Sequence, residues 1–198
     1  MNLPNKLTLL RIMLVPLFVA AMLIPFPLHN LAALLIFAIA SITDMFDGRI
    51  ARERNLVTDF GKFADPLADK ILVLAAMLCF VQNGLCDCVA VIIVLLREFA
   101  VTSIRLIAAA KGEVVAANIW GKVKTVTQMV AIITILVMQT LCDILNEFAG
   151  IDVSIAPHSI ISEIFFCVGE MLIWISTIFA IISGVIYLKQ NWKFIEEI

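Results

Sequence analysis

The chain has 198 residues, of which 63% are hydrophobic and 15% are charged, and its mean hydropathy is +1.08. A water-soluble domain is nearer half apolar, so this composition excludes one and predicts a polytopic membrane protein. The net charge of −2 says little by itself, because the charges are sorted by position along the chain. We expect no nucleic-acid partner.

Apolar runs alternate with short polar connectors along the whole chain. A helix must span a hydrocarbon layer of about 30 Å, and the runs are long enough to predict an all-α fold with six transmembrane helices in one membrane domain, residues 1–198. The segment from Asn2 to Arg11 is expected to form a short interfacial helix, and Pro16 to break the first span. The expected spans run up to about residue 28, over about 31–52, 61–81 and 86–110, up to about 141, and over 160–188.

The basic residues are distributed asymmetrically about these spans. Six spans place both termini on one side, and cytoplasmic connectors carry an excess of Lys and Arg. The connectors around His29, around Asp87 and from Asp143 to His158 contain neither residue type. We therefore expect both termini, and the polar stretch described next, on the cytoplasmic side of the inner membrane.

One polar stretch, residues 44–69, runs from the end of the second expected span into the start of the third. Four of its five aspartates form two pairs, Asp44 with Asp47 and Asp65 with Asp69, at spacings of three and four residues. Residues at these spacings share a helix face, and clustered carboxylates at a membrane boundary need counter-charge. A surface loop with scattered acids is the alternative, which two such pairs disfavour. Oxygen ligands favour hard cations, so we predict two divalent ions, Mg²⁺ or Mn²⁺.

The residues beside the first pair indicate what such a site could act on. Paired carboxylates that hold two divalent ions are a recurring device for phosphoryl transfer. Gly48 and Ala51 are small, so a phosphate or ribose could approach the helix backbone closely. Arg52 adds a fixed cation. The pattern predicts a reaction that joins a lipid-borne phosphate to a water-borne partner.

A second cationic group lies on the fourth expected span and in the polar approach to the fifth. Charged residues inside apolar helices mark function by default, and arginine matches phosphate oxygens with two parallel donors. The group therefore suits an acceptor that carries its own phosphate, although Arg97 could instead pair with Glu98 or Glu170. The candidate acceptor-phosphate residues are Arg97, Arg105, Lys122 and Lys124.

The spacing of the polar stretch resembles a known signature. The eight fixed positions of the CDP-alcohol phosphatidyltransferase signature are matched by Asp44-x-x-Asp47-Gly48-x-x-Ala51-Arg52, eight residues, then Gly61-x-x-x-Asp65-x-x-x-Asp69. Three further stretches resemble the branch of the family that uses glycerol 3-phosphate: NLPNKLTLLR, DPLADKIL and REFAVTSIRLIAAAKGEVVAANIWGKVKTVTQ. The resemblance covers about residues 2–130, and the last third of the chain matches in hydrophobicity alone.

The resemblance implies a fold, a reaction and a set of site residues. The family fold has six transmembrane helices and a cavity that faces the cytoplasm, usually in a homodimer. The implied reaction transfers the phosphatidyl group of CDP-diacylglycerol to sn-glycerol 3-phosphate, giving phosphatidylglycerophosphate and CMP, by two-metal-assisted attack of the acceptor hydroxyl on the β-phosphorus. The implied metal ligands are Asp44, Asp47, Asp65 and Asp69, with Asp69 also the general base. The implied CDP-diacylglycerol pocket comprises Asn5, Thr8, Gly48, Ala51, Arg52 and Gly61.

Two alternatives to this function stay open from the sequence. Within the family, the acceptor could be serine, inositol phosphate or phosphatidylglycerol. Outside it, intramembrane aspartates could serve a divalent-cation transporter. A transporter would place its acids near the midplane of the bilayer, whereas these cluster at the expected cytoplasmic edge beside Gly48 and Arg52.

Overall fold

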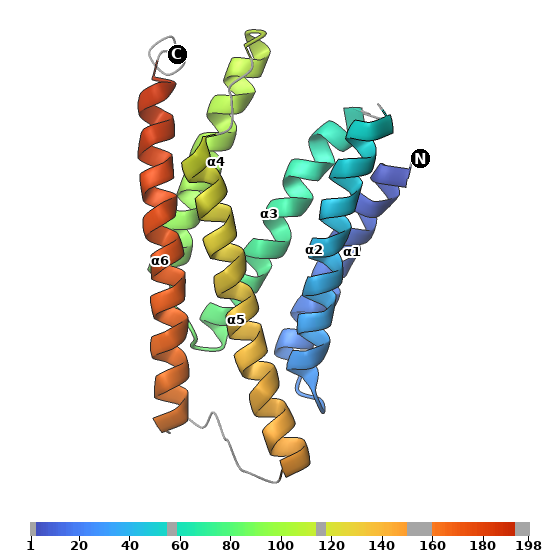
Figure 1. Cartoon of the computed structure of the whole chain (residues 1–198), viewed down its shortest axis with the longest axis vertical. Helices are drawn as coiled ribbons and strands as arrows, with labels where there is room; N and C mark the ends of the chain where they lie inside the picture. The colour runs from blue at the N-terminus through green and yellow to red at the C-terminus, as the bar shows by residue number, and fades with distance from the viewer. Residues whose placement is uncertain (1–2, 55–58, 114–117, 150–159, 193–198) are drawn as a thin grey trace.

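A computed structural model of the chain describes residues 3–54, 59–113, 118–149 and 160–192, without the side chains of residues 3–5, 44–54, 59–66, 69, 149 and 162. The secondary structure of these described residues is helical, which confirms the all-α prediction (Figure 1). In chain order, the helices of the described part are α1 (Leu3–Leu23), α2 (His29–Arg54), α3 (Asp59–Gln82), α4 (Cys88–Ala110), α5 (Ile119–Ala149) and α6 (Ile160–Gln190).

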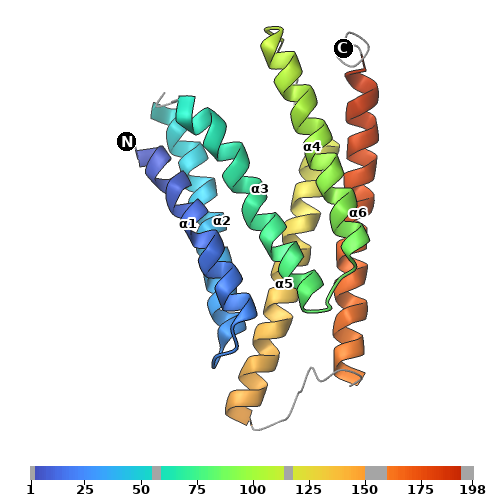
Figure 2. The same cartoon turned by 180° about the vertical axis from the view of Figure 1, so that it is seen from behind.

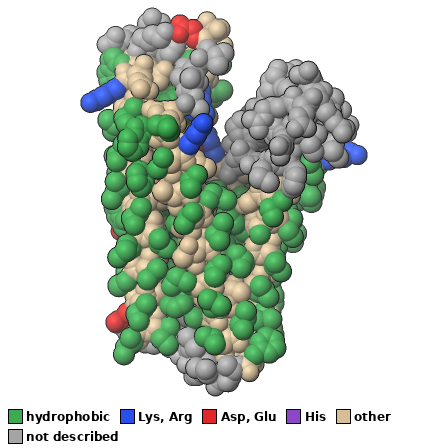
Figure 3. Space-filling view, viewed as in Figure 1, with side chains coloured by type: hydrophobic (Ala, Val, Ile, Leu, Met, Phe, Trp, Pro, Cys, Tyr) green, Lys and Arg blue, Asp and Glu red, His purple; other side chains and the backbone are tan. Residues whose placement is uncertain are grey.

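Three of the described helices contain segments long and apolar enough to cross a membrane, Lys6–Leu23, Ile119–Phe148 and Glu163–Gln190. The apolar parts of α2 and α3 are shorter, His29–Thr43 and Lys70–Gln82, because the rest of each helix carries the acidic stretch. Hydrophobic side chains cover most of the described lateral surface in Figure 3. The chain is therefore an integral membrane protein.

The helices pack as two groups with α3 between them (Figures 1 and 2). α1 packs against α2 and α3, while α6 packs against α4 and α5. The start of α1, the end of α2, the start of α3 and the ends of α4 and α6 lie at one end, called here the upper end. The α1–α2 connector, the end of α5 and the start of α6 lie at the opposite, lower end. The acidic stretch therefore shares the upper end with the last turns of α4 and α6.

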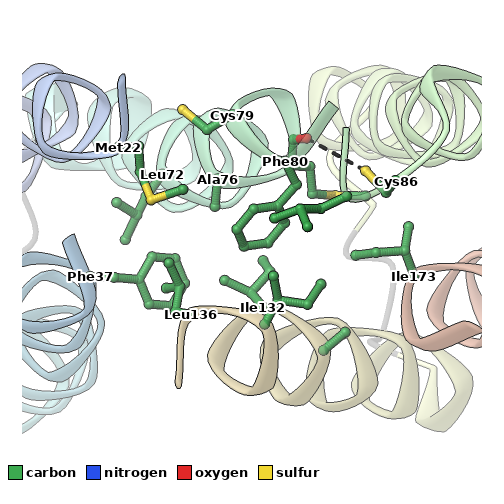
Figure 4. Close-up of a cluster of buried hydrophobic side chains, with 14 of the residues drawn as sticks. Met22, Phe37, Leu72, Ala76, Cys79, Phe80, Cys86, Ile132, Leu136 and Ile173 are labelled. Carbon is green, nitrogen blue, oxygen red and sulfur yellow. Dashed lines mark hydrogen bonds between the residues drawn. The ribbon is translucent and has the colours of Figure 1, made fainter. Parts of the chain in front are cut away.

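A shared core joins helices of both groups. In Figure 4, Phe37 of α2, Phe80 of α3, Ile132 and Leu136 of α5 and Ile173 of α6 turn toward one another, and each is fully buried or nearly so. Lipid tails are as apolar as these side chains, so close packing, rather than exclusion of water, holds membrane helices together. This core fixes the helices that carry the polar residues of the upper end.

A polar contact ties the start of α2 to α5 at the lower end. The backbone N–H and the side-chain amide of Asn30 donate to the two carboxylate oxygens of Asp143, at 3.1 and 3.0 Å. The first N–H groups of a helix lack partners within the helix. A carboxylate at this end also interacts favourably with the positive end of the helix dipole. Asp143 thus caps α2 from α5, which runs on to Ala149 instead of ending near residue 141 as the sequence predicted.

The sequence prediction for the first span is corrected at both of its ends. α1 is continuous from Leu3 to Leu23, so the segment up to Arg11 forms no separate interfacial helix and Pro16 does not break the span. A helix within a membrane protein tolerates proline where neighbouring groups satisfy the freed backbone carbonyl. The helix ends before Pro25 and Pro27, where the connector begins.

Candidate active site

The two aspartate pairs lie on the two helices that meet at the upper end. Asp44 and Asp47 are in the second half of α2, and Asp65 and Asp69 are in the first half of α3. This confirms the prediction that each pair occupies a helix, where spacings of three and four residues define one face. α2 and α3 contact each other, and both views show them close together at the upper end and diverging below it (Figures 1 and 2). The side chains of these aspartates lie outside the described residues, so their coordination of metal stays a prediction.

The predicted nucleotide pocket draws on the same helices and on the start of α1. Thr8 is fully buried, and Arg11, one turn further along α1, is only 1% exposed. Their spacing puts both on one face, and because α1 packs against α2 and α3, that face is turned into the bundle. The sequence analysis assigned Arg11 no role at the site, and its burial in a largely apolar helix makes it a further candidate, since charges there mark function by default. The other pocket residues are Asn5 on α1, Gly48, Ala51 and Arg52 on α2, and Gly61 on α3, with side chains outside the described residues.

Two of the predicted acceptor-phosphate residues converge on one carboxylate. Glu98 Oε1 on α4 accepts hydrogen bonds from Nζ of Lys124 on α5, at 2.9 Å, and from a terminal nitrogen of Arg97, at 2.7 Å. The side chains of Lys124, Arg97 and Glu98 are 7%, 13% and 20% exposed. Charge-assisted hydrogen bonds in such sheltered surroundings are stronger than those on a water-exposed surface. Of the two carboxylates that the sequence offered to Arg97, the structure selects Glu98.

Arg97 is also held by α6 and bordered by α5. Its Nε donates to Oγ of Ser183, at 3.1 Å. A Cβ placed on Gly184 would lie 3.0 Å from Cγ of Arg97, and one on Gly121 would lie 3.5 Å from its second terminal nitrogen. Two glycines, Gly121 of α5 and Gly184 of α6, therefore make room for the arginine of α4. Even a methyl group at Gly184 would require the Arg97 side chain to shift by a few tenths of an ångström.

Arg105 and Lys122 are the more exposed members of the predicted group. Arg105 donates from Nε to the Tyr187 hydroxyl, at 3.3 Å, and its guanidinium carbon lies 5.6 Å from the centre of that ring. This cation–π contact with α6 orients the guanidinium, although the residue remains exposed. Lys122 is exposed on the first turns of α5. Figure 3 shows that the Lys and Arg side chains visible on this face gather toward the upper end.

A further polar contact links α3, which carries the second aspartate pair, to α4, which carries Arg97 and Arg105. Nζ of Lys70, the residue after Asp69 on α3, donates to Oγ1 of Thr102 on α4. Thr102 in turn donates to the backbone carbonyl of Glu98, at 2.7 Å. The turn of α3 that follows the second aspartate pair is thereby joined to the turn of α4 that carries Arg97 and Glu98. The sequence did not predict this contact, since it depends on how two helices align.

The described cations and the aspartate-bearing helices together suit chemistry on phosphate. Cations on α4 and α5 can bind phosphate oxygens, and paired carboxylates on α2 and α3 can hold divalent ions. An integral membrane bundle with both features at one end has the parts expected of a membrane-embedded phosphotransferase. Comparison with known proteins agrees with this class.

Residues 1–182 match the family described as CDP-alcohol phosphatidyltransferase, and the chain belongs to that family. A protein of Bacillus subtilis is 42% identical over 204 residues, covering 97% of this chain and 96% of its own length. A protein of Rickettsia felis is 37% identical over 193 residues, covering 98% and 97%. Both carry the name CDP-diacylglycerol–glycerol-3-phosphate 3-phosphatidyltransferase.

Proposed function

We propose that this protein transfers the phosphatidyl group from CDP-diacylglycerol to sn-glycerol 3-phosphate, forming phosphatidylglycerophosphate and releasing CMP. The observation that carries the proposal is the similarity, over 97% of the chain, to a protein named for this reaction. The basic residues described on α4 and α5 support it, because they suit an acceptor that bears a phosphate.

The aspartates of α2 and α3 fit a pair of divalent cations, Mg²⁺ or Mn²⁺. They are hard oxygen donors, they lie at helical spacings, and their two helices are in contact at one end of the bundle. Asp44, Asp47, Asp65 and Asp69 would hold the two ions. When bound, the ions would supply charge stabilisation for the phosphate oxygens and the leaving CMP.

The remaining site residues divide between the two substrates. Gly48, Ala51 and Gly61 would let the CDP moiety approach the helix backbones, and Arg52, Asn5 and Thr8 would hydrogen-bond it. Asp69 would accept the proton of the acceptor hydroxyl as this oxygen attacks the β-phosphorus. Arg105 and Lys122 would bind the acceptor's own phosphate, together with the sheltered pair Arg97 and Lys124.

Replacing Arg105 with alanine is expected to weaken acceptor binding selectively. Loss of a hydrogen bond from a charged group costs about 1.5–3 kcal/mol, so the KM for glycerol 3-phosphate should rise about tenfold or more. The KM for CDP-diacylglycerol should change little. Steady-state kinetics with each substrate varied in turn measures both constants, and Lys189→Ala, at the exposed end of α6, serves as the cationic control. Equal changes in the two KM values would instead assign Arg105 a structural role on Tyr187.

The same proposal includes a topology of six membrane spans, with both termini and a substrate cavity on the cytoplasmic side, and a homodimeric assembly. The absence of Lys and Arg from residues 82–88, which join α3 to α4, supports an outer location for this connector.

Cys88 is exposed at the start of α4, whereas the neighbouring Cys86 is buried. Burial raises the pKa of the Cys86 thiol to about 12, and the nearby Glu170 and Asp87 add to the shift.

Labelling of Cys88 from outside the cell tests this topology. The thiolate is the reactive form of cysteine, so a membrane-impermeant maleimide should label Cys88 in intact cells, while Cys86 stays unlabelled. Lys189→Cys, in a chain with its native cysteines replaced, should react only after the membrane is opened. The reverse pattern, with residue 189 labelled in intact cells and Cys88 protected, would contradict the assigned orientation.

An assay with a panel of acceptors tests the proposed function. Purified protein would receive CDP-diacylglycerol, Mg²⁺ and one acceptor at a time: glycerol 3-phosphate, inositol phosphate, serine or phosphatidylglycerol. CMP release with glycerol 3-phosphate alone is the expected result. CMP release with a different acceptor would support the proposed reaction type but contradict glycerol 3-phosphate as the acceptor. Absence of CMP release with every acceptor would overturn the proposed function.

A further inference from the structure

Glu98 is the carboxylate at the centre of the basic group on α4 and α5. Its partners differ in how firmly the rest of the described chain holds them. Arg97 is additionally fixed by Ser183 and enclosed beside Gly184. Lys124 has Glu98 as its hydrogen-bond partner among the described residues. Glu98 is therefore the described group that determines where the Lys124 ammonium lies.

We propose that Glu98 is a positioning residue that holds Lys124 ready for the phosphate of the acceptor, an inference that rests on the proposed function. A lysine ammonium sits on a flexible four-carbon stem with three rotatable donors. Ordering that stem before the substrate arrives removes part of the entropy cost of binding. One hydrogen bond to Glu98 leaves two N–H groups of Lys124 for phosphate oxygens.

The geometry of the ion pair supports a role beyond holding the helices together. Within the described residues, the backbones of α4 and α5 make no close approach of their own, so the two long side chains bridge the space between them. A sheltered ion pair of this kind is weak evidence for stability, because desolvation offsets much of its attraction. The bridge does, however, bring a cation of α5 to the α4 turn that bears Arg97.

The charge balance around Lys124 also points to an anionic ligand. Besides Glu98, its described electrostatic neighbours include two like charges, Arg97 and Lys70. Arg97 and Lys124 share Glu98 as their described carboxylate partner, and the side chains of both cations are largely sheltered from solvent. Two cations held side by side in this way suit the oxygens of a phosphate dianion. Since Lys70 follows Asp69 directly, the same cluster lies next to the α3 turn that carries the proposed base.

The test is a double-mutant cycle on the purified, active enzyme. Glu98→Gln keeps the side-chain size and removes the charge, so the KM for glycerol 3-phosphate should rise about tenfold, the loss of one charge-assisted hydrogen bond. The kcat and the KM for CDP-diacylglycerol should stay within about twofold. If Glu98 acts through Lys124, then Glu98→Gln in a Lys124→Met background should raise the acceptor KM no further.

Two further variants complete the experiment. Glu98→Asp keeps the charge with a shorter reach, and its acceptor KM should fall between those of the wild type and Glu98→Gln. Glu163→Gln, at an exposed carboxylate on the first turn of α6, is the matched control and should leave all constants unchanged. Thermal unfolding in detergent checks that each variant is folded. If Glu98→Gln is not folded, the acceptor KM of Glu98→Asp alone decides whether Glu98 has the positioning role.

The outcomes separate this inference from the function on which it rests. Wild-type enzyme that releases no CMP with glycerol 3-phosphate overturns both. Wild-type turnover combined with an unchanged acceptor KM in the folded Glu98 variants overturns the positioning role alone. The positioning role is also overturned if the effects of Glu98→Gln and Lys124→Met on the acceptor KM multiply in the double variant. An equal rise in the KM values for glycerol 3-phosphate and CDP-diacylglycerol would overturn it as well.

Discussion

Replacing Asp69 with asparagine is expected to lower kcat by about 10²–10⁴-fold, the usual contribution of a general base. An alcohol is a poor nucleophile while protonated, so a group at the site must take its proton. His29 begins α2 at the lower end, where its Nδ1 lies 3.1 Å from the carbonyl oxygen of Ala21, and His158 lies outside the described residues. Lys70 is cationic and contacts Thr102. These points favour an aspartate as the proposed base, and Asp69 lies on α3, which Lys70 joins to the α4 turn that carries Arg97 and Glu98.

Kinetics at saturating concentrations of both substrates measures this effect, with CDP-diacylglycerol binding expected to be largely retained. Asp59→Asn, at the first residue of the same helix, is the matched control and should be near wild type. Asparagine keeps one oxygen that can bind a metal but cannot accept the proton. Titration of Asp69→Asn with Mg²⁺ therefore separates the two roles of the residue. A near-normal kcat would eliminate Asp69 as the base.

Removal of divalent cations is expected to abolish activity, and addition of Mg²⁺ or Mn²⁺ to restore it. Charge stabilisation by a bound metal is worth several kcal/mol in the transition state, and each 1.36 kcal/mol is a factor of ten in rate. Asp44→Ala or Asp65→Ala should therefore lower the rate by about a hundredfold or more. Both variants should still fold, because core residues such as Phe37, Phe80 and Ile132 pack independently of them.

The measurement is CMP release by protein treated with excess chelator and then supplied with one metal at a time. Glu163→Gln, distant from the aspartates, should show the metal dependence of the wild type. Undiminished turnover in excess chelator would refute the assignment of the four aspartates to metal binding.

The helical placement of the acidic stretch could be predicted because it depends on local spacing alone. Asp44 with Asp47, and Asp65 with Asp69, match the helical repeat, and the structure confirms a helix at each pair. The lengths of α1 and α5 could not be predicted in the same way. Pro16 lies within a continuous helix, which its intrinsic preference does not predict, although transmembrane helices tolerate proline.

The contacts between helices could not be predicted from a single sequence. Glu98 and Lys124 are 26 residues apart and on different helices, so their meeting depends on the packing and rotation of α4 and α5. Arg97 and Glu98 are adjacent, and adjacent residues do not face each other on a helix. They meet because the arginine side chain is long enough to turn back toward the carboxylate. Tyr187 beneath Arg105 likewise became evident only from the alignment of α4 with α6.

Tracing the acceptor oxygen tests the proposed reaction most directly. Glycerol 3-phosphate would carry a heavy oxygen isotope at its attacking hydroxyl and be supplied with CDP-diacylglycerol, Mg²⁺ and purified protein. Attack at the β-phosphorus predicts that mass spectrometry finds the isotope in phosphatidylglycerophosphate and finds CMP unlabelled. Isotope in the nucleotide product would place the attack at the other phosphorus, and a lipid product without the isotope would contradict attack by the acceptor hydroxyl.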